Sequence, residues 1–417
     1  MLMSFKFKQN YSSLTADEIT KKTYQCDLWR GGFEGVLSSG AQTFCLFIAI
    51  RYFDAEATTK SLIAAAPFMG MFLSMLLLHY ASKTNWEKST WGAIASTVTG
   101  GCLLIAAWTT SLYLFATFVV IAYISRSALL PFITDIYGDN YPPSRRGAIF
   151  SKSLVLSVGV AALSGFIGSS ILEKDIEYFS FLFTFLGLCA FLKAMAIYCM
   201  PSKKLDNSPH AHPFGNMKYA LQDRSFGYVL LTWFIMGFAN LWTLPLRVDY
   251  LTAPQWGIEG SAIFVAMIIT VIPETLRMLL IPFWARLFDK MNFVVLRMIL
   301  NLSFGAGILL FFISSNPWVI GAGSALIGIA FAGGSIAWNL WVTKYAPPGK
   351  TGAYMSVHVS LTGIRGTIGP ILGFWTVNQI GAQNIGILSC AMMFFATLML
   401  IPEIKHGRQM QLKGKSL

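Results

Sequence analysis

Several ionisable residues lie inside long apolar stretches of this sequence. Arg126, Arg365 and the pair Glu274 and Arg277 fall well inside such stretches, and Glu34 follows the start of the first one. A charge near the centre of a bilayer costs at least about 2.5 to 3.5 kcal/mol, so it needs a partner or a watery cavity. Because a guanidinium offers a planar fork to carboxylate or phosphate, this surplus of arginine favours an anionic ligand. Alternatively, backbone carbonyls hold the three arginines, and they do not contact a solute.

Glu274 and Arg277 are three residues apart, which places them on one helix face. They can form an internal salt bridge, or Glu274 can take up a proton when Arg277 or a substrate moves. Glu34 has the same two interpretations. It either pairs along the helix with Arg30, four residues earlier, or titrates at the inner mouth of a pathway.

Other charges in apolar stretches have more ordinary explanations. Lys193 is expected to extend toward the cytoplasm, with a structural role. Arg297 is expected to anchor its helix at the interface, and Lys152 and Asp135 to lie close to the inner interface.

The composition identifies the class of protein to which these residues belong. The chain has 417 residues, 55% hydrophobic and only 12% charged, against about 25% charged in a soluble domain. Its mean hydropathy is +0.59. The sequence therefore predicts an all-α integral membrane protein.

Apolar runs of about 20 residues, each enough to cross the membrane as a helix, recur along the chain. We place twelve spans at about 29–52, 60–80, 90–110, 112–136, 148–171, 178–200, 226–250, 260–285, 293–314, 318–342, 352–377 and 384–402. The corresponding organisation is a cytoplasmic leader at 1–28, a six-helix half at 29–200, a cytoplasmic connector at 201–225, a second half at 226–402 and a cytoplasmic tail at 403–417. Within the leader, Thr15 and Glu18 form a capping-box pattern for a short helix.

The distribution of charge sets the orientation. The net charge is +12, but the predicted outer segments hold only Arg51, Lys60 and Lys174, so both termini are expected inside. This distribution explains the basic excess without nucleic acid. No cysteine falls on an outer loop, and no disulfide framework is expected.

The two halves share a repeated segment. Residues 142–168 match residues 347–373 at an offset of 205 positions, with identities that include Pro142 and Pro347, and Gly168 and Gly373. Pro67 and Pro273 stand 206 positions apart in two further spans. The sequence thus predicts two pseudo-symmetric halves produced by duplication.

Two six-helix halves, cytoplasmic termini, a long central connector and a basic turn after the second helix of each half resemble the major facilitator superfamily (MFS) of transporters. The loop signature of that superfamily, Gly-x-x-x-Asp-Arg/Lys-x-Gly, is recognisable from Trp284 to Asn292, with Asp289 and Lys290 in place and both glycines replaced. In the first half the aspartate of this signature is absent. The Gly-Pro element of many exporters is also absent from the fifth span.

The resemblance implies a central cavity built largely from the first, fourth, seventh and tenth helices. It therefore gives candidate residues, although each tryptophan is also compatible with packing. The candidates for substrate binding are Arg126, Arg365, Asn240, Trp242, Trp338 and Asn339; those for proton coupling are Glu274, Arg277 and Glu34; those for gating and the loop motif are Arg286, Asp289, Lys290, Arg145 and Arg146. Arg247 and Asp249 are expected to line an outer vestibule.

We therefore expect a secondary active transporter of a small solute, an organic anion moved with protons by alternating access. The alternatives are an exporter of amphiphilic or lipid compounds, and a non-transporting sensor on the same fold. An enzyme is not expected, because no nucleophile, zinc or phosphate-loop motif is present. We expect no cofactor, no metal site and no nucleic-acid partner, and a monomer in a bacterial inner membrane.

Overall fold

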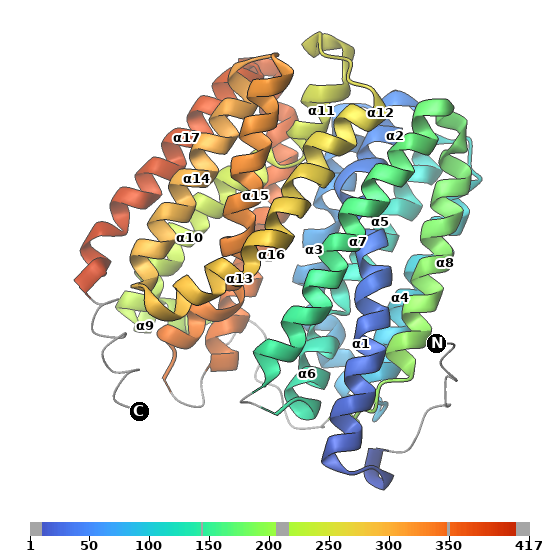
Figure 1. Ribbon diagram of the computed structural model, residues 1–417, viewed down its shortest axis with the longest axis vertical. Coiled ribbons are helices and arrows are strands. Elements are labelled where there is room, and N and C mark those ends of the chain that lie inside the picture. Colours follow the sequence, from blue (N-terminus) through green and yellow to red (C-terminus); the bar gives the residue numbers. More distant parts are fainter. Residues whose placement is uncertain (1–10, 143–144, 206–216, 348–350, 406–417) are drawn as a thin grey trace. The chain divides into compact units, whose positions relative to one another are not determined.

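The computed structural model describes residues 11–142, 145–205, 217–347 and 351–405. Helices dominate this part of the chain, and its one β-bridge, between Glu87 and Lys204, is isolated (Figure 1). Eleven helical segments within it are long and apolar enough to cross a membrane. The all-α membrane class predicted from the sequence is confirmed.

The chain divides into two compact units. The N-terminal unit comprises Met1–Ala55 and Ala66–His210, and the C-terminal unit comprises Glu56–Ala65 and Ala211–Leu417. The helices from the first to the eighth are α1 (Ala16–Ser39), α2 (Cys45–Arg51), α3 (Ala57–Ser82), α4 (Lys88–Ala107), α5 (Leu112–Ala128), α6 (Leu130–Asn140), α7 (Arg146–Lys174) and α8 (Phe179–Tyr198).

The remaining helices follow the connector. They are α9 (Lys218–Gln222), α10 (Arg224–Thr243), α11 (Leu246–Thr252), α12 (Ala262–Ala266), α13 (Ile272–Lys290), α14 (Phe293–Ile313), α15 (Pro317–Leu340), α16 (Thr351–Ile380) and α17 (Ala382–Met399). The predicted span at 352–377 lies within α16. Two π-helical segments, η2 (Gly40–Phe44) and η6 (Met267–Val271), join α1 to α2 and α12 to α13.

The first helix is longer than predicted. Thr15 caps α1 through a complete capping box with Glu18, as its sequence pattern indicates. However, α1 then continues without a break into the first membrane span. The prediction of a separate leader helix was wrong, because residues 19–30 contain no glycine or proline to end the helix.

Prolines divide two other spans. Leu129 separates α5 from α6, with Pro131 in the first turn of α6, and Leu244 and Pro245 separate α10 from α11. A proline inside a helix removes a backbone donor and crowds the preceding turn, which explains a break at these positions.

The repeated segments form equivalent helices. Arg146 and Thr351, the first residues of α7 and α16, stand at the offset of 205 positions found in the sequence. Both helices pack closely on a partner through glycine. A Cβ at Gly35 of α1 would lie 2.3 Å from the Ser157 carbonyl oxygen of α7, and a Cβ at Gly373 of α16 would lie 2.5 Å from the Trp242 carbonyl oxygen of α10.

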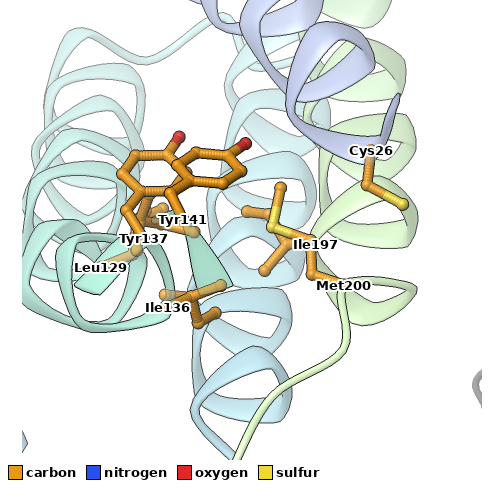
Figure 2. Packing of buried hydrophobic residues seen from close by; sticks show 9 residues of the cluster. Cys26, Leu129, Ile136, Tyr137, Tyr141, Ile197 and Met200 are labelled. Atoms are coloured by element: carbon orange, nitrogen blue, oxygen red, sulfur yellow. The ribbon is translucent and has the colours of Figure 1, made fainter. Parts of the chain in front are cut away.

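An apolar cluster holds α1, α6 and α8 together (Figure 2). The rings of Tyr137 on α6 and Tyr141 just after it are stacked with centroids 5.2 Å apart, and Cys26, Ile197 and Met200 pack in the same cluster. The Tyr137 hydroxyl donates to a carboxylate oxygen of Asp27, which ties the polar edge of the cluster to α1. This packing fixes α1 and α8, which carry Glu34 and Lys193.

Candidate functional site

A carboxylate of α1 lies between two cations from other helices. Oε1 of Glu34 is 2.6 Å from Nη2 of Arg126 on α5, and Oε2 is 2.5 Å from Nζ of Lys193 on α8. The side chains of Lys193, Arg126 and Glu34 are 2%, 13% and 24% exposed. We call these three residues the Glu34 cluster. With two cations and one carboxylate, it carries a net positive charge that favours an anion.

Neighbouring residues hold the Glu34 cluster in place. The guanidinium carbon of Arg126 lies 5.6 Å from the centroid of the Tyr123 ring, at a distance suited to a cation–π contact. The buried Tyr123 hydroxyl donates to the carbonyl of Leu37 at 3.4 Å, which ties α5 to α1. Gly35, the residue after Glu34, has no side chain. The α7 helix can therefore approach the backbone of α1 closely at this level.

Two predictions about these charges were wrong. Arg30 does not pair with Glu34; its Nε donates to Asp27 at 2.7 Å and its Nη2 to Ser153 at 3.4 Å. Lys193 does not extend to the cytoplasm, since it is almost fully buried against Glu34. The spacing rule considers only partners on one helix, whereas Glu34 finds its partners on two other helices.

Glu274 and Arg277 are adjacent on α13. Their closest contact is 3.2 Å, and Nε of Arg277 also donates to the Ser335 hydroxyl of α15 at 3.0 Å. The intrahelical salt bridge predicted from the spacing of three is therefore present. Their side chains are 8% and 23% exposed, respectively.

Arg365 is buried against α10. Its Nη1 donates to the carbonyl oxygen of Trp233, and its Nη2 donates to the Thr362 hydroxyl at 3.1 Å. The guanidinium fills the space beside Gly237, where a Cβ would lie 2.2 Å from Cζ of Arg365. Arg365 is thus held by backbone and hydroxyl groups in the C-terminal unit.

The other predicted substrate residues do not gather at one place. Trp242 is buried and its indole donates to the Thr376 hydroxyl at 3.0 Å, which fits a packing role. Trp338 lies beside the ring of His358, and Asn339 is exposed, with its amide donating to Ser335 on its own helix. Asn240 is half-buried, and its Oδ1 has no hydrogen-bond partner.

The pair predicted for an outer vestibule is instead buried. Arg247 is 5% and Asp249 1% exposed. Asp249 is 2.5 Å from the ammonium of Lys60 and accepts from the Trp256 indole at 2.9 Å. Lys60, which the sequence analysis placed on an outer segment, is thus the ion-pair partner of Asp249.

Three of the predicted loop-motif residues can be placed. Arg286, Lys290 and Arg145 are exposed. The side chains of Asp289 and Arg146 lie outside the described structure, so the predicted motif contacts stay predictions.

The sequence did not predict the buried surroundings of Arg297 and His358. Arg297 is only 3% exposed, so its prediction as an interface anchor was wrong. His358 is fully buried among aromatic rings and was not singled out, because a histidine in an apolar helix is usually a packing residue. The duplication offered a signal, since position 153, the equivalent of His358, is a serine.

The chain was compared with known proteins in sequence and structure. A family model described as Major Facilitator Superfamily matches residues 257–416. Comparison of the whole sequence with curated proteins finds no significant match.

Solved structures match across nearly the whole chain. The nucleoside transporter NupG has a TM-score of 0.67 at 12% identity, over 92% of this chain and 98% of that chain. A D-xylose-proton symporter has a TM-score of 0.69 at 15% identity, over 92% and 96%. The human organic anion transporter MFSD10 (TETRAN) has a TM-score of 0.60 at 14% identity, over 92% and 98%.

At these low identities the solved structures establish the fold alone. The family model matches the sequence within the second half of the chain. The chain therefore resembles the major facilitator superfamily: the family model matches residues 257–416, and solved structures of transporters share the fold.

Proposed function

We propose that the protein is a secondary active transporter that moves a small organic anion together with a proton. The observation that carries this proposal is the position of Glu34 between Arg126 and Lys193. A substrate carboxylate or phosphate can take the place of the Glu34 carboxylate, since it offers the two cations the same charge and the same acceptor atoms. The cluster is therefore suited to exchange an internal anion for an external one.

Proton coupling follows from this exchange. A carboxylate that loses both cations inside the membrane is costly to keep ionised, so the displaced Glu34 takes up a proton. When the substrate leaves, Glu34 releases the proton and returns to Arg126 and Lys193. One anion and one proton thus move in the same direction.

We assign this role to Glu34 in preference to Glu274. The cations of Glu34 come from α5 and α8, so movement of either helix or entry of a substrate changes its environment. Arg277, which is paired with Glu274, lies one turn away on the same helix and moves with it. The Glu274–Arg277 pair fits a structural contact to α15 through Ser335.

The transport mechanism, the oligomeric state and the location that we propose follow from the resemblance to the major facilitator superfamily. The two halves rock around a midplane site to alternate access, and the protein works as a monomer in a bacterial inner membrane with both termini in the cytoplasm. The similar structures support the coupling and the substrate class, since they include a D-xylose-proton symporter and a human organic anion transporter.

The test is uptake by purified protein in liposomes, with an inward proton gradient and a panel of small carboxylates and phosphates. Glu34→Gln is expected to lose at least about 90% of gradient-driven accumulation while counterflow exchange survives, because an amide binds no proton but the two cations remain. Glu274→Gln is the matched control and is expected to keep accumulation.

Other outcomes would change the assignment. Loss of coupling in Glu274→Gln with normal coupling in Glu34→Gln would move the proton site to the C-terminal unit. Absence of uptake for every anion would contradict the substrate class. An exporter of amphiphilic compounds would then be tested by efflux from the same liposomes, and ligand binding without flux would indicate a sensor.

A further inference from the structure

Two arginines and a histidine of the C-terminal unit meet at one tryptophan. Arg365 of α16 donates to the backbone carbonyl of Trp233, and the guanidinium of Arg297 on α14 lies 4.1 Å from the centroid of the Trp233 ring. The ring of His358 is 5.1 Å from that of Trp233. Trp341 is stacked on Trp233 with centroids 5.4 Å apart and lies 5.2 Å from His358. We call these five residues the Trp233 cluster.

The two arginines of the Trp233 cluster have no carboxylate partner among the described residues. Arg297, Arg365 and His358 are 3%, 4% and 0% exposed, and neither arginine forms an ion pair within the described residues. The contacts of Arg297 are the Trp233 ring and the Met236 sulfur, at 2.7 Å from Nη2. A buried guanidinium without an anion is strongly unfavourable.

Several polar atoms of the same cluster also lack hydrogen-bond partners. They are Nε of Arg297 and of Arg365, both ring nitrogens of His358, and the indole nitrogens of Trp233 and Trp341. Five of these six nitrogens are N–H donors, since a neutral imidazole carries a single N–H. Buried donors normally have partners, so a group of them around two cations calls for an acceptor with negative charge.

We propose that the Trp233 cluster binds a compact anion, either a halide or the carboxylate of a small acid. The size limit follows from the rigid surroundings. Trp233 and Trp341 form a stacked wall, Trp338 lies 5.3 Å from His358, and the guanidinium of Arg365 already fills the space beside Gly237. This site lies within the C-terminal unit and shares no residue with the Glu34 cluster, so it does not depend on the proposed transport function.

The site can be tested with the full-length protein in detergent, in a gluconate buffer of constant ionic strength. Sodium bromide and sodium formate are titrated separately while tryptophan fluorescence and thermal unfolding are recorded. Bromide quenches nearby indoles, so the wild type is expected to show saturable quenching and a rise in Tm. Arg365→Gln and Arg297→Gln are expected to weaken the apparent affinity at least about tenfold.

Arg247→Gln is the matched control. Arg247 is buried in the same unit but donates to the Leu244 carbonyl, so its replacement is expected to leave binding unchanged. Trp341→Phe keeps the stacked ring but removes one indole donor, and it is expected to weaken binding several-fold even if an arginine variant does not fold. Saturation by both anions identifies an inorganic anion site, whereas saturation by formate alone identifies the acid group of an organic solute.

A purely structural role predicts a different result. If the arginines are satisfied by Trp233 and Met236 alone, Arg365→Gln lowers Tm by the same amount in gluconate and in bromide. That result, or the absence of saturation by both anions in the wild type, would overturn the proposal.

Discussion

Lys193 shows how one residue determines the charge of its surroundings. Its side chain is 2% exposed and its ammonium lies 2.5 Å from Glu34, so Lys193→Met removes one of the two cations around the carboxylate. Breaking a buried pair in this way costs about 3 kcal/mol or more. We expect Lys193→Met to lower stability by about this amount and to abolish anion uptake, as measured by thermal unfolding and liposome transport.

A double variant separates charge from packing at this residue. Glu34→Gln with Lys193→Met leaves Arg126 as the only charge of the cluster, and it is expected to regain part of the stability lost in Lys193→Met alone. Equal losses in the single and double variants would show that the Lys193 stem, and not its contact with Glu34, supports the helices.

At the scale of elements, the close contact of α1 with α7 depends on a missing side chain. A Cβ at Gly35 would lie 2.8 Å from Cβ of Val160 and still closer to the backbone of α7. We expect Gly35→Ala to destabilise the protein by about 1 to 3 kcal/mol, because the helices must separate or shift. Thermal unfolding of the purified protein measures the effect.

Gly32 on the same helix is the control, since a Cβ there has nothing within 4 Å. Gly32→Ala is expected to be neutral or to stabilise by about 0.5 to 1 kcal/mol, because alanine loses less backbone entropy in a helix. A similar loss in both variants would mean that helix flexibility, rather than contact with α7, requires the glycines.

The sequence predicted helices better than the partners of their side chains. Hydrophobic length located the spans, and the capping box at Thr15 located the start of α1. Partners such as Lys193 for Glu34 come from helices far apart in the sequence, and a spacing rule cannot choose among them. The Trp233 cluster was missed for the same reason, because His358, Arg297 and Trp233 come from three helices.

At the scale of the whole molecule, the predicted orientation can be measured by labelling. Lys83 and Glu177 are both exposed, and they lie in segments predicted on opposite sides of the membrane. Lys83→Cys is expected to react with a membrane-impermeant maleimide only in inside-out vesicles, and Glu177→Cys only in right-side-out vesicles.

The native cysteines give little background in this experiment. Cys26, Cys45, Cys102 and Cys189 are buried, and Cys199 and Cys390 are intermediate in exposure. Labelling of both introduced cysteines from one side would contradict the charge-based orientation.

The π-helical turn in the first span affects how this chain aligns with its relatives. The Cys45 amide donates to the Gly40 carbonyl, five residues earlier, so this turn holds one residue more than a regular α-helix. A homologue whose helix lacks this π-helical turn would be one residue shorter here. Before and after the turn, its helix would present the same faces as this chain. The correct alignment of such a pair would place a gap in the middle of a membrane span, where alignment methods penalise gaps most. Distant relatives of this chain are therefore compared more securely by superposition than by sequence in this span.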